Sequence, residues 1–161
     1  MGQQVKLNDG VSINLPDRVE KLNKEQAISH ARQKFNNNKI VLNSIDRRSF
    51  RHIYKVDDVL ITLFVFDTTF KAKDGHIAEL KKGLDGMSRG DKTYTSFLKT
   101  INNNSVLILN HIAIDVEYYN FYCYNANNTR VITGILEFNI ADKDKATTIL
   151  NDIINSIKFK D

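Results

Sequence analysis

The stretch VLITLFVF at residues 59–66 decides the fold class, because it is apolar at every position except Thr62. Its length suits a strand, and a strand that is apolar on both faces belongs at the centre of a sheet covered on both sides. Residues 50–56 precede it across Asp57 and Asp58, a spacing that predicts a two-residue hairpin. The sequence therefore predicts an antiparallel sheet with helices on both of its faces.

The rest of the chain supplies more strands and three helices. Strands are predicted at residues 5–7, 11–15, 40–45, 93–100, 106–111, 115–124 and 130–139. Helices are predicted over residues 24–35, 75–87 and 142–157, where apolar side chains recur at helical spacing. The apolar stripe of the second helix consists of Ile77, Leu80, Leu84 and Met87, and that of the third of Ala146, Ile149, Leu150, Ile153, Ile154 and Ile157. Asn23 and Asp142 are the expected N-caps, with Gln26 completing a capping box at the first. This order predicts one α+β domain over residues 1–161, with a largely antiparallel sheet.

Composition limits the classes of function. The 161 residues carry a net charge of +4, from 23 basic and 19 acidic side chains. The densest basic clusters, at residues 47–51 and 71–73, are small, so we expect a solvated surface and no nucleic-acid partner. No apolar run approaches the ~20 residues of a membrane span. The single cysteine, Cys123, stands in an aromatic strand and is expected to be a buried structural thiol.

Motifs for catalysis are missing from the sequence. The four histidines have no metal-ligand spacing, and His30 is expected to be solvated because it lies off the apolar stripe of its helix. The carboxylate pair at Asp57 and Asp58 fits a turn, and Asp142 with Asp144 fits a helix start. Neither a phosphate-binding glycine loop nor a nucleophile elbow is present. We therefore expect no catalytic residue, no metal and no cofactor, and predict that the protein is not an enzyme.

The aromatic strand YYNFYCY at residues 118–124 is the most suggestive segment for binding. Alternation places one set of side chains on one face and Tyr119, Phe121 and Cys123 on the other. One face must be core, whereas the other is amphipathic and is a candidate partner surface. The alternative is that helices cover both faces. The candidate surface consists of Tyr118, Asn120, Tyr122 and Tyr124.

Both ends of the chain carry short motifs that resemble those of a known superfamily. The segment GVSINLP at residues 10–16, the strand GILEF at 134–138 and the helix end IINSIKF at 153–159 resemble the PsbP/DcrB-like superfamily. The resemblance implies an α/β/α sandwich of PsbP-like type that serves as a non-enzymatic accessory or binding module. Members act as photosystem extrinsic subunits, nuclear-transport cofactors, secretion chaperones and small envelope lipoproteins. Function does not follow from fold alone.

The beginning of the chain and its composition suggest a compartment. Residues 1–4, MGQQ, resemble the mature start left after signal-peptide removal, and we expect them to be disordered. The 18 asparagines, with abundant Lys and Ile, are typical of an AT-rich bacterial genome. We therefore expect an exported, periplasmic or extracellular, accessory protein of the bacterial envelope that binds a protein or a small ligand. The alternative is a cytoplasmic interaction module, such as an effector chaperone or a toxin's immunity protein. The oligomeric state stays open.

Overall fold

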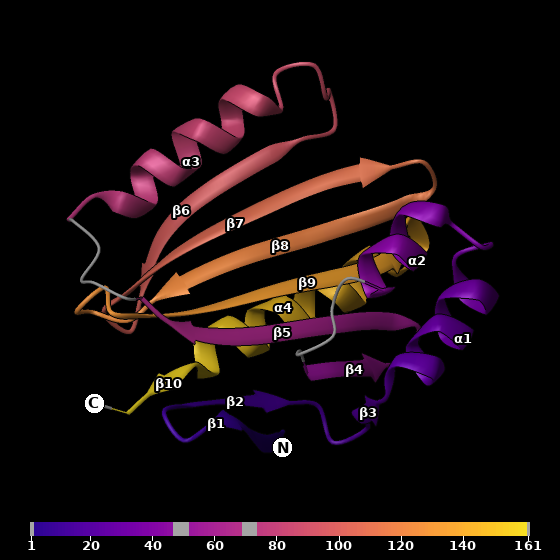
Figure 1. The fold of residues 1–161 in the computed structure, drawn as a ribbon, viewed down its shortest axis with the longest axis horizontal. Coiled ribbons are helices and arrows are strands. Elements are labelled where there is room, and N and C mark those ends of the chain that lie inside the picture. Colours follow the sequence, from indigo (N-terminus) through magenta and orange to yellow (C-terminus); the bar gives the residue numbers. More distant parts are fainter. Residues whose placement is uncertain (1, 47–51, 69–73, 161) are drawn as a thin grey trace.

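The computed structural model describes residues 2–46, 52–68 and 74–160, which form two antiparallel sheets and four α-helices (Figure 1). The large sheet has the spatial order β3 (Glu20–Leu22), β4 (His52–Val56), β5 (Val59–Asp67), β9 (Arg130–Asn139), β8 (Val116–Tyr124), β7 (Asn104–Ala113) and β6 (Thr95–Ile101). The small sheet has the order β1 (Gln3–Asn8), β2 (Val11–Leu15) and β10 (Lys158–Phe159). The helices are α1 (Lys24–Lys34), α2 (Lys39–Asp46), α3 (His76–Met87) and α4 (Lys143–Ser156), with a 3₁₀ turn at Ile140–Asp142 before α4.

Helices cover both faces of the large sheet, as the sequence predicts. Helix α4 and the small sheet pack on one face, here called the α4 face. Helices α1 and α2 pack on the opposite face, over β4, β5 and the start of β8, and α3 contacts β6 and β7. We call this second face the tyrosine face, because β8 places its candidate tyrosines there. The α/β/α sandwich is thus confirmed.

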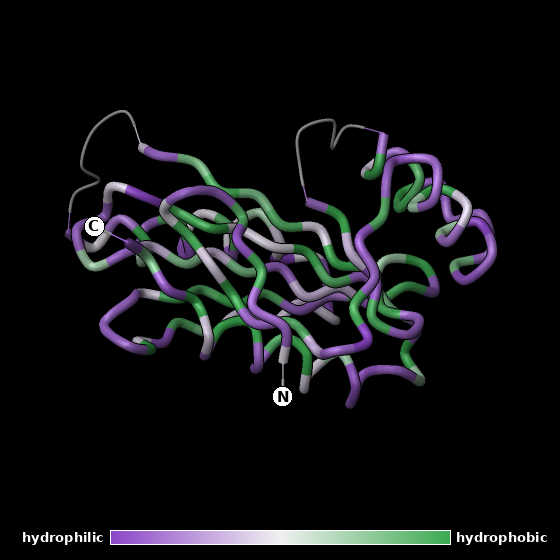
Figure 2. Tube along the Cα trace, turned by 90° about the horizontal axis from the view of Figure 1, so that it is seen from below, coloured by the Kyte–Doolittle hydropathy of each residue, from purple (hydrophilic) through white to green (hydrophobic). Residues whose placement is uncertain are grey.

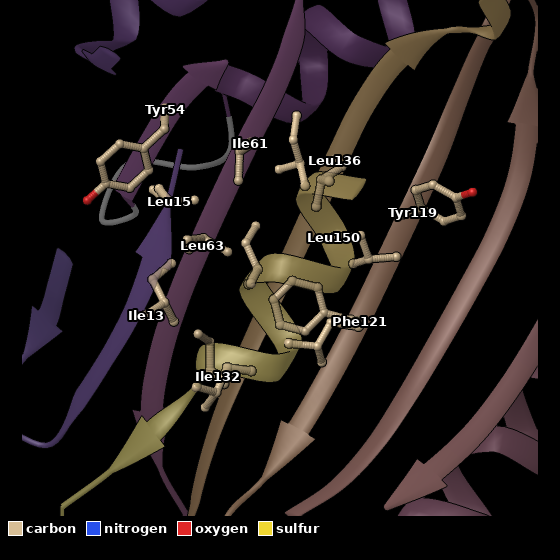
Figure 3. Packing of buried hydrophobic residues seen from close by; sticks show 14 of the residues in the cluster. Ile13, Leu15, Tyr54, Ile61, Leu63, Tyr119, Phe121, Ile132, Leu136 and Leu150 are labelled. Carbon is tan, nitrogen blue, oxygen red and sulfur yellow. The ribbon is translucent and has the colours of Figure 1, made fainter. Parts of the chain in front are cut away.

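The main core lies between the large sheet and α4 (Figure 3). Side chains of β2, β5, β8, β9 and α4 meet there, among them Ile13, Leu63, Phe121, Ile132 and Leu150. Along α4 the buried residues are Ala146, Ile149, Leu150, Ile153 and Ile154, which is the stripe that the sequence predicts. Figure 2 shows hydrophobic stretches along the central strands and hydrophilic segments in the loops at both ends of the molecule.

The N-terminal hairpin corrects one expectation. Its strands pair as predicted around an Asn-Asp-Gly turn, but β1 already begins at Gln3. Gln3 pairs with Leu15, and Gln4 pairs with Asn14. The disorder expected for residues 1–4 is therefore wrong for Gln3 and Gln4, since both residues belong to the β1–β2 ladder.

The segment predicted as a strand at residues 40–45 is instead helix α2. Val41 and Ile45, four residues apart, are both buried against α1 and the tyrosine face. The side-chain oxygen of Asn38 accepts hydrogen bonds from the backbone N–H groups of Ile40 and Val41, at 2.9 and 3.3 Å. This cap satisfies the first free N–H groups of the helix. Cap and helical spacing together outweigh the strand preference of the β-branched residues.

The other local predictions are mostly confirmed. The capping box of Asn23 and Gln26 forms with both of its hydrogen bonds. Asp57 has a φ of 52° in the two-residue turn between β4 and β5. Asp142 is not a side-chain cap, because the 3₁₀ turn before α4 directs its carboxylate to Lys145. The basic clusters predicted at 47–51 and 71–73 lie outside the described residues.

Candidate functional site

Strand β8 alternates between the two faces of the sheet as predicted. Tyr119, Phe121 and Cys123 belong to the main core on the α4 face. The other four side chains point to the tyrosine face, where Tyr118 lies beside His111 of β7 and Tyr122 beside Leu107. Both sides of β8 are paired, with β7 on one side and β9 on the other.

The structure brings only half of the candidate partner surface toward solvent. Tyr118 is buried beneath α1 and α2 and stacks on His111, with ring centroids 4.9 Å apart. Tyr124 is buried too, and the ring of His76 from α3 meets it edge-on at 5.6 Å. These two residues are therefore internal packing residues. Asn120 and Tyr122 are half-buried between them.

Two phenylalanines of β5 extend this exposed part of the face. The strand registers place Phe64 across Thr133 of β9 from Tyr122, and Phe66 in the same way across Val131 from Tyr124. Phe64 and Phe66 stack on each other with centroids 5.7 Å apart, and Phe66 is 45% exposed. We call Phe64, Phe66, Asn120 and Tyr122 the aromatic patch.

Sequence reasoning missed the two phenylalanines because it assigned all of residues 59–66 to the covered centre of the sheet. Burial along β5 is complete only from Val59 to Leu63 and then declines. Helices α1 and α2 pack over Leu60, near the beginning of β5. The signal that could have revealed the patch is the pair of phenylalanines at alternate positions at the end of the strand.

Helix α3 packs loosely beside the patch. None of its residues is buried, although Ile77, Leu80 and Leu84 are half-buried as its predicted stripe requires. Met87, the fourth residue of that stripe, is exposed.

Asp85 attaches α3 to the sheet. Its carboxylate accepts hydrogen bonds from the Ser96 hydroxyl at 2.6 Å and the Tyr94 hydroxyl at 2.9 Å, and Lys81 lies 2.6 Å away. The Lys81 ammonium, followed by the Ser96 hydroxyl, lowers the pKa of Asp85 from 3.8 to about 2.

The interactions of Asp85 predict that the stability of the protein depends on pH. A carboxyl group with a lowered pKa stabilises the fold above its unfolded pKa, near 3.8, and this contribution is lost as the pH falls toward about 2. We expect Asp85→Asn to be less stable than the native protein at pH 6, and the difference to vanish near pH 2. Urea unfolding at several pH values measures it. Glu79→Gln, at an exposed position of the same helix, is the control and should show no such convergence. A difference that stays constant down to pH 2 would contradict the assignment.

Comparison with known proteins finds a similar architecture among solved structures. No protein family and no curated protein matches the sequence. The solution structure of cyanobacterial PsbP (CyanoP) from Synechocystis sp. PCC 6803 matches 98% of this chain and 92% of its own, with a TM-score of 0.54 and 12% sequence identity.

The chain has a PsbP-like fold. At 12% identity this similarity concerns the fold alone. The resemblance of the terminal motifs, which predicted such a fold, is thereby confirmed at the level of architecture.

Ionisable groups inside this PsbP-like fold are held by neighbouring side chains. Glu117 is almost completely buried, and its Oε1 lies 2.5 Å from the Lys143 ammonium and accepts a hydrogen bond from Asn110 at 2.9 Å. The expectation that His30 is solvated is wrong, because His30 is buried and packs edge-on against Phe35. Helix α1 directs its ring toward the β4–β5 turn, where the ring lies 3.4 Å from the Asp58 carbonyl oxygen. Burial lowers the pKa of His30.

Reactive and metal-binding groups are not brought together in the described part of the fold. Cys123 is buried, as predicted, and burial raises the pKa of its thiol to about 12, which disfavours the nucleophilic thiolate. Within residues 2–46, 52–68 and 74–160, no three His, Cys, Asp or Glu side chains are grouped to hold a metal ion. No helix of the same ranges is long and apolar enough to cross a bilayer.

Proposed function

We propose that this chain is a non-catalytic accessory protein of the bacterial cell envelope that holds a partner protein on the aromatic patch. The observation that carries the proposal is the exposure of Phe66, which stacks on Phe64, on the same sheet face as the half-buried Tyr122 and next to a loosely packed helix. Exposed aromatic side chains on an otherwise ordered surface are typical of protein interfaces.

The geometry favours a protein over a small ligand. The patch belongs to β5 and β8, the two strands that flank β9 in one sheet, so its side chains share one broad surface. Such a surface offers apolar contact area, whereas small ligands are usually held in concave pockets that enclose most of their surface. Aromatic residues in the middle of an interface contribute most of its binding free energy.

Site-specific crosslinking tests the proposal. A photoreactive amino acid at position 66 in the full-length native gene product should crosslink one protein, and Tyr122→Ser should weaken that partner's affinity about 30-fold, the effect of losing about 2 kcal/mol at a hot spot. Ile140→Ser is the matched control, because Ile140 is also exposed but lies far from the patch. It follows the last residue of β9, whereas Val131, which pairs with Phe66, lies near the beginning of that strand. Equal affinity for Tyr122→Ser and Ile140→Ser would contradict the role of the patch.

The compartment is tested separately. Fractionation of cells that carry the complete native gene with a C-terminal tag should place the protein in the envelope or outside the cell. Recovery in the cytoplasm alone would reject the envelope assignment and favour the cytoplasmic interaction module. The role of the aromatic patch would then still be decided by the crosslinking experiment.

A further inference from the structure

Strand β6 forms an exposed edge of the large sheet. It is seven residues long, follows β7 along its whole length, and ends the strand order on that side. Phe97 is 55% exposed on the α4 face, and Leu98 is 43% exposed on the tyrosine face. The edge is therefore apolar on both faces, which natural proteins usually avoid because such edges invite another strand.

The register shows which backbone groups point outward. The turn between β6 and β7 has two residues, Asn102 and Asn103, both with positive φ, so Ile101 and Asn104 form the first hydrogen-bonded pair. Because bonded and non-bonded pairs alternate along an antiparallel ladder, the backbone N–H and C=O groups of Phe97 and Lys99 hydrogen-bond to β7. The N–H and C=O groups of Ser96, Leu98 and Thr100 point away from it. In the part of the chain that the structure describes, no backbone or side-chain group hydrogen-bonds to these outward groups.

Helix α3 leaves this edge accessible. The helix contacts both β6 and β7, which places it over the sheet face and not in the position of a further strand. Its hydrogen bonds to β6 go to the side chain of Ser96, which points to the tyrosine face. An added strand would therefore lie beside β6 and below α3.

The other strand edges carry protective features. Strand β3, at the opposite end of the large sheet, has only three residues, and its Glu20 pairs with Lys55. In the small sheet, β1 is bulged between Lys6 and Asn8, and β10 has two residues. Short, charged and bulged strands are the usual means of blocking edge pairing. Strand β6 has none of them except the single charge of Lys99.

Basic side chains lie on β6 and on the neighbouring helix α3. A shallow depression of about 530 Å³ on α3, lined by three basic side chains and one carboxylate, borders the β6 edge through Asp85. Lys81 pairs with Asp85, whereas Lys82, Arg89 and Lys99 have no carboxylate partner among the described residues. A segment with carboxylates fits these cations, and an extended backbone fits the outward N–H and C=O groups.

We propose that the outer edge of β6 receives an extended, acidic segment of another protein as an additional strand. Its backbone pairs with Ser96, Leu98 and Thr100, its apolar side chains cover Phe97 and Leu98, and its carboxylates face Lys82, Arg89 and Lys99. This edge is separate from the aromatic patch, so the inference holds whether or not that patch binds a partner.

A peptide titration followed by amide hydrogen exchange tests the proposal. The probe is a blocked seven-residue peptide, Glu-Glu-Val-Val-Glu-Glu-Val, which presents both glutamate and valine on each face of a strand, and the matched control replaces glutamate with lysine. The acidic peptide should bind the full chain at least about tenfold more tightly than the basic one, and added salt should weaken it. It should slow exchange at the amides of Ser96, Leu98 and Thr100, but leave Phe97 and Lys99, already bonded to β7, almost unchanged.

Two variants separate backbone pairing from electrostatic attraction between the acidic peptide and the basic surface. Leu98→Pro removes an outward N–H without removing a bond to β7, and should weaken the acidic peptide at least about tenfold. Leu98→Ala keeps the N–H and should bind within about threefold of the native chain. Equal binding of the two peptides, or no slowing at the three amides of the native chain, would overturn the proposal. Protection of these amides in a self-associated form of the chain would overturn it too, because the occupant would then be a second copy.

Discussion

Replacing Gly134 with alanine is expected to lower the free energy of unfolding by about 1–3 kcal/mol, the usual cost of overpacking a core. Gly134 lies in the middle of β9 opposite Phe121, and a Cβ there would stand 2.1 Å from the Phe121 ring and 2.8 Å from Leu63. Both of those side chains are completely buried, so neither ring nor methyl group can move aside freely. Chemical denaturation of the native and variant proteins measures the loss.

The cause can be separated from a general glycine effect. In a Phe121→Leu background, the smaller side chain frees space above residue 134, so Gly134→Ala should cost at least about 0.5 kcal/mol less than in the native chain. Gly83→Ala on α3 is the matched control, because apart from the adjoining backbone of its own helix no described atom lies within 4 Å of the added Cβ. It should stabilise the protein by about 0.5–1 kcal/mol through helix propensity. A destabilisation as large as that of Gly134→Ala would refute the steric explanation.

Replacing Lys143 with methionine is expected to cost about 1–3 kcal/mol at neutral pH. The Glu117 side chain is 1% exposed, and without the ammonium its buried carboxylate keeps, among the described residues, only the hydrogen bond from Asn110. The loss is smaller than for a fully buried ion pair, because Lys143 itself is 48% exposed and water screens the interaction.

The pH dependence of this pair has a definite sign. The hydrogen bond to Glu117 raises the pKa of Lys143 above 10.5. The stabilisation is therefore complete below pH 10.5 and is lost as the pH rises through the higher folded-state pKa. The native protein and Lys143→Met should converge in stability in that alkaline range, as measured by urea unfolding.

Two further variants test whether the cost comes from the buried carboxylate. Lys145→Met removes the neighbouring ion pair with Asp142, whose atoms are 3.3 Å apart at the surface, and should cost less than about 1 kcal/mol. Adding Glu117→Gln to Lys143→Met should recover part of the loss, since the neutral amide is easier to bury. A double variant less stable than Lys143→Met alone would argue against this account.

The sequence predicts the architecture well where one pattern dominates. Strand β5 is apolar on both faces, so other elements must pack on both of them. The apolar stripe of α4 identifies this helix as one of those elements. Short segments are harder to predict, because the apolar residues at 40–45 fit a strand or a helix. A cap by Asn38 and burial against α1 decide for the helix. Both depend on neighbours that a local pattern does not contain.

The candidate surface could be predicted only in part. Alternation correctly separates Tyr118 and Tyr122 from the core residues of β8. It cannot tell that α1 and α2 cover the beginning of that strand, so the burial of Tyr118 depends on where two helices end in space. The exposed edge of β6 was likewise beyond prediction, since the order of strands is a property of the assembled sheet.

The pairing of β2 with β10 has a consequence for biosynthesis. Strand β2 lies at residues 11–15, whereas β10 and α4, which pack against it, lie at residues 143–159. While a ribosome makes the chain, Ile13 and Leu15 emerge early and stay uncovered until almost the whole domain has left the exit tunnel. The main core therefore closes only after residues 143–159 have emerged, and the nascent chain exposes apolar surface until then.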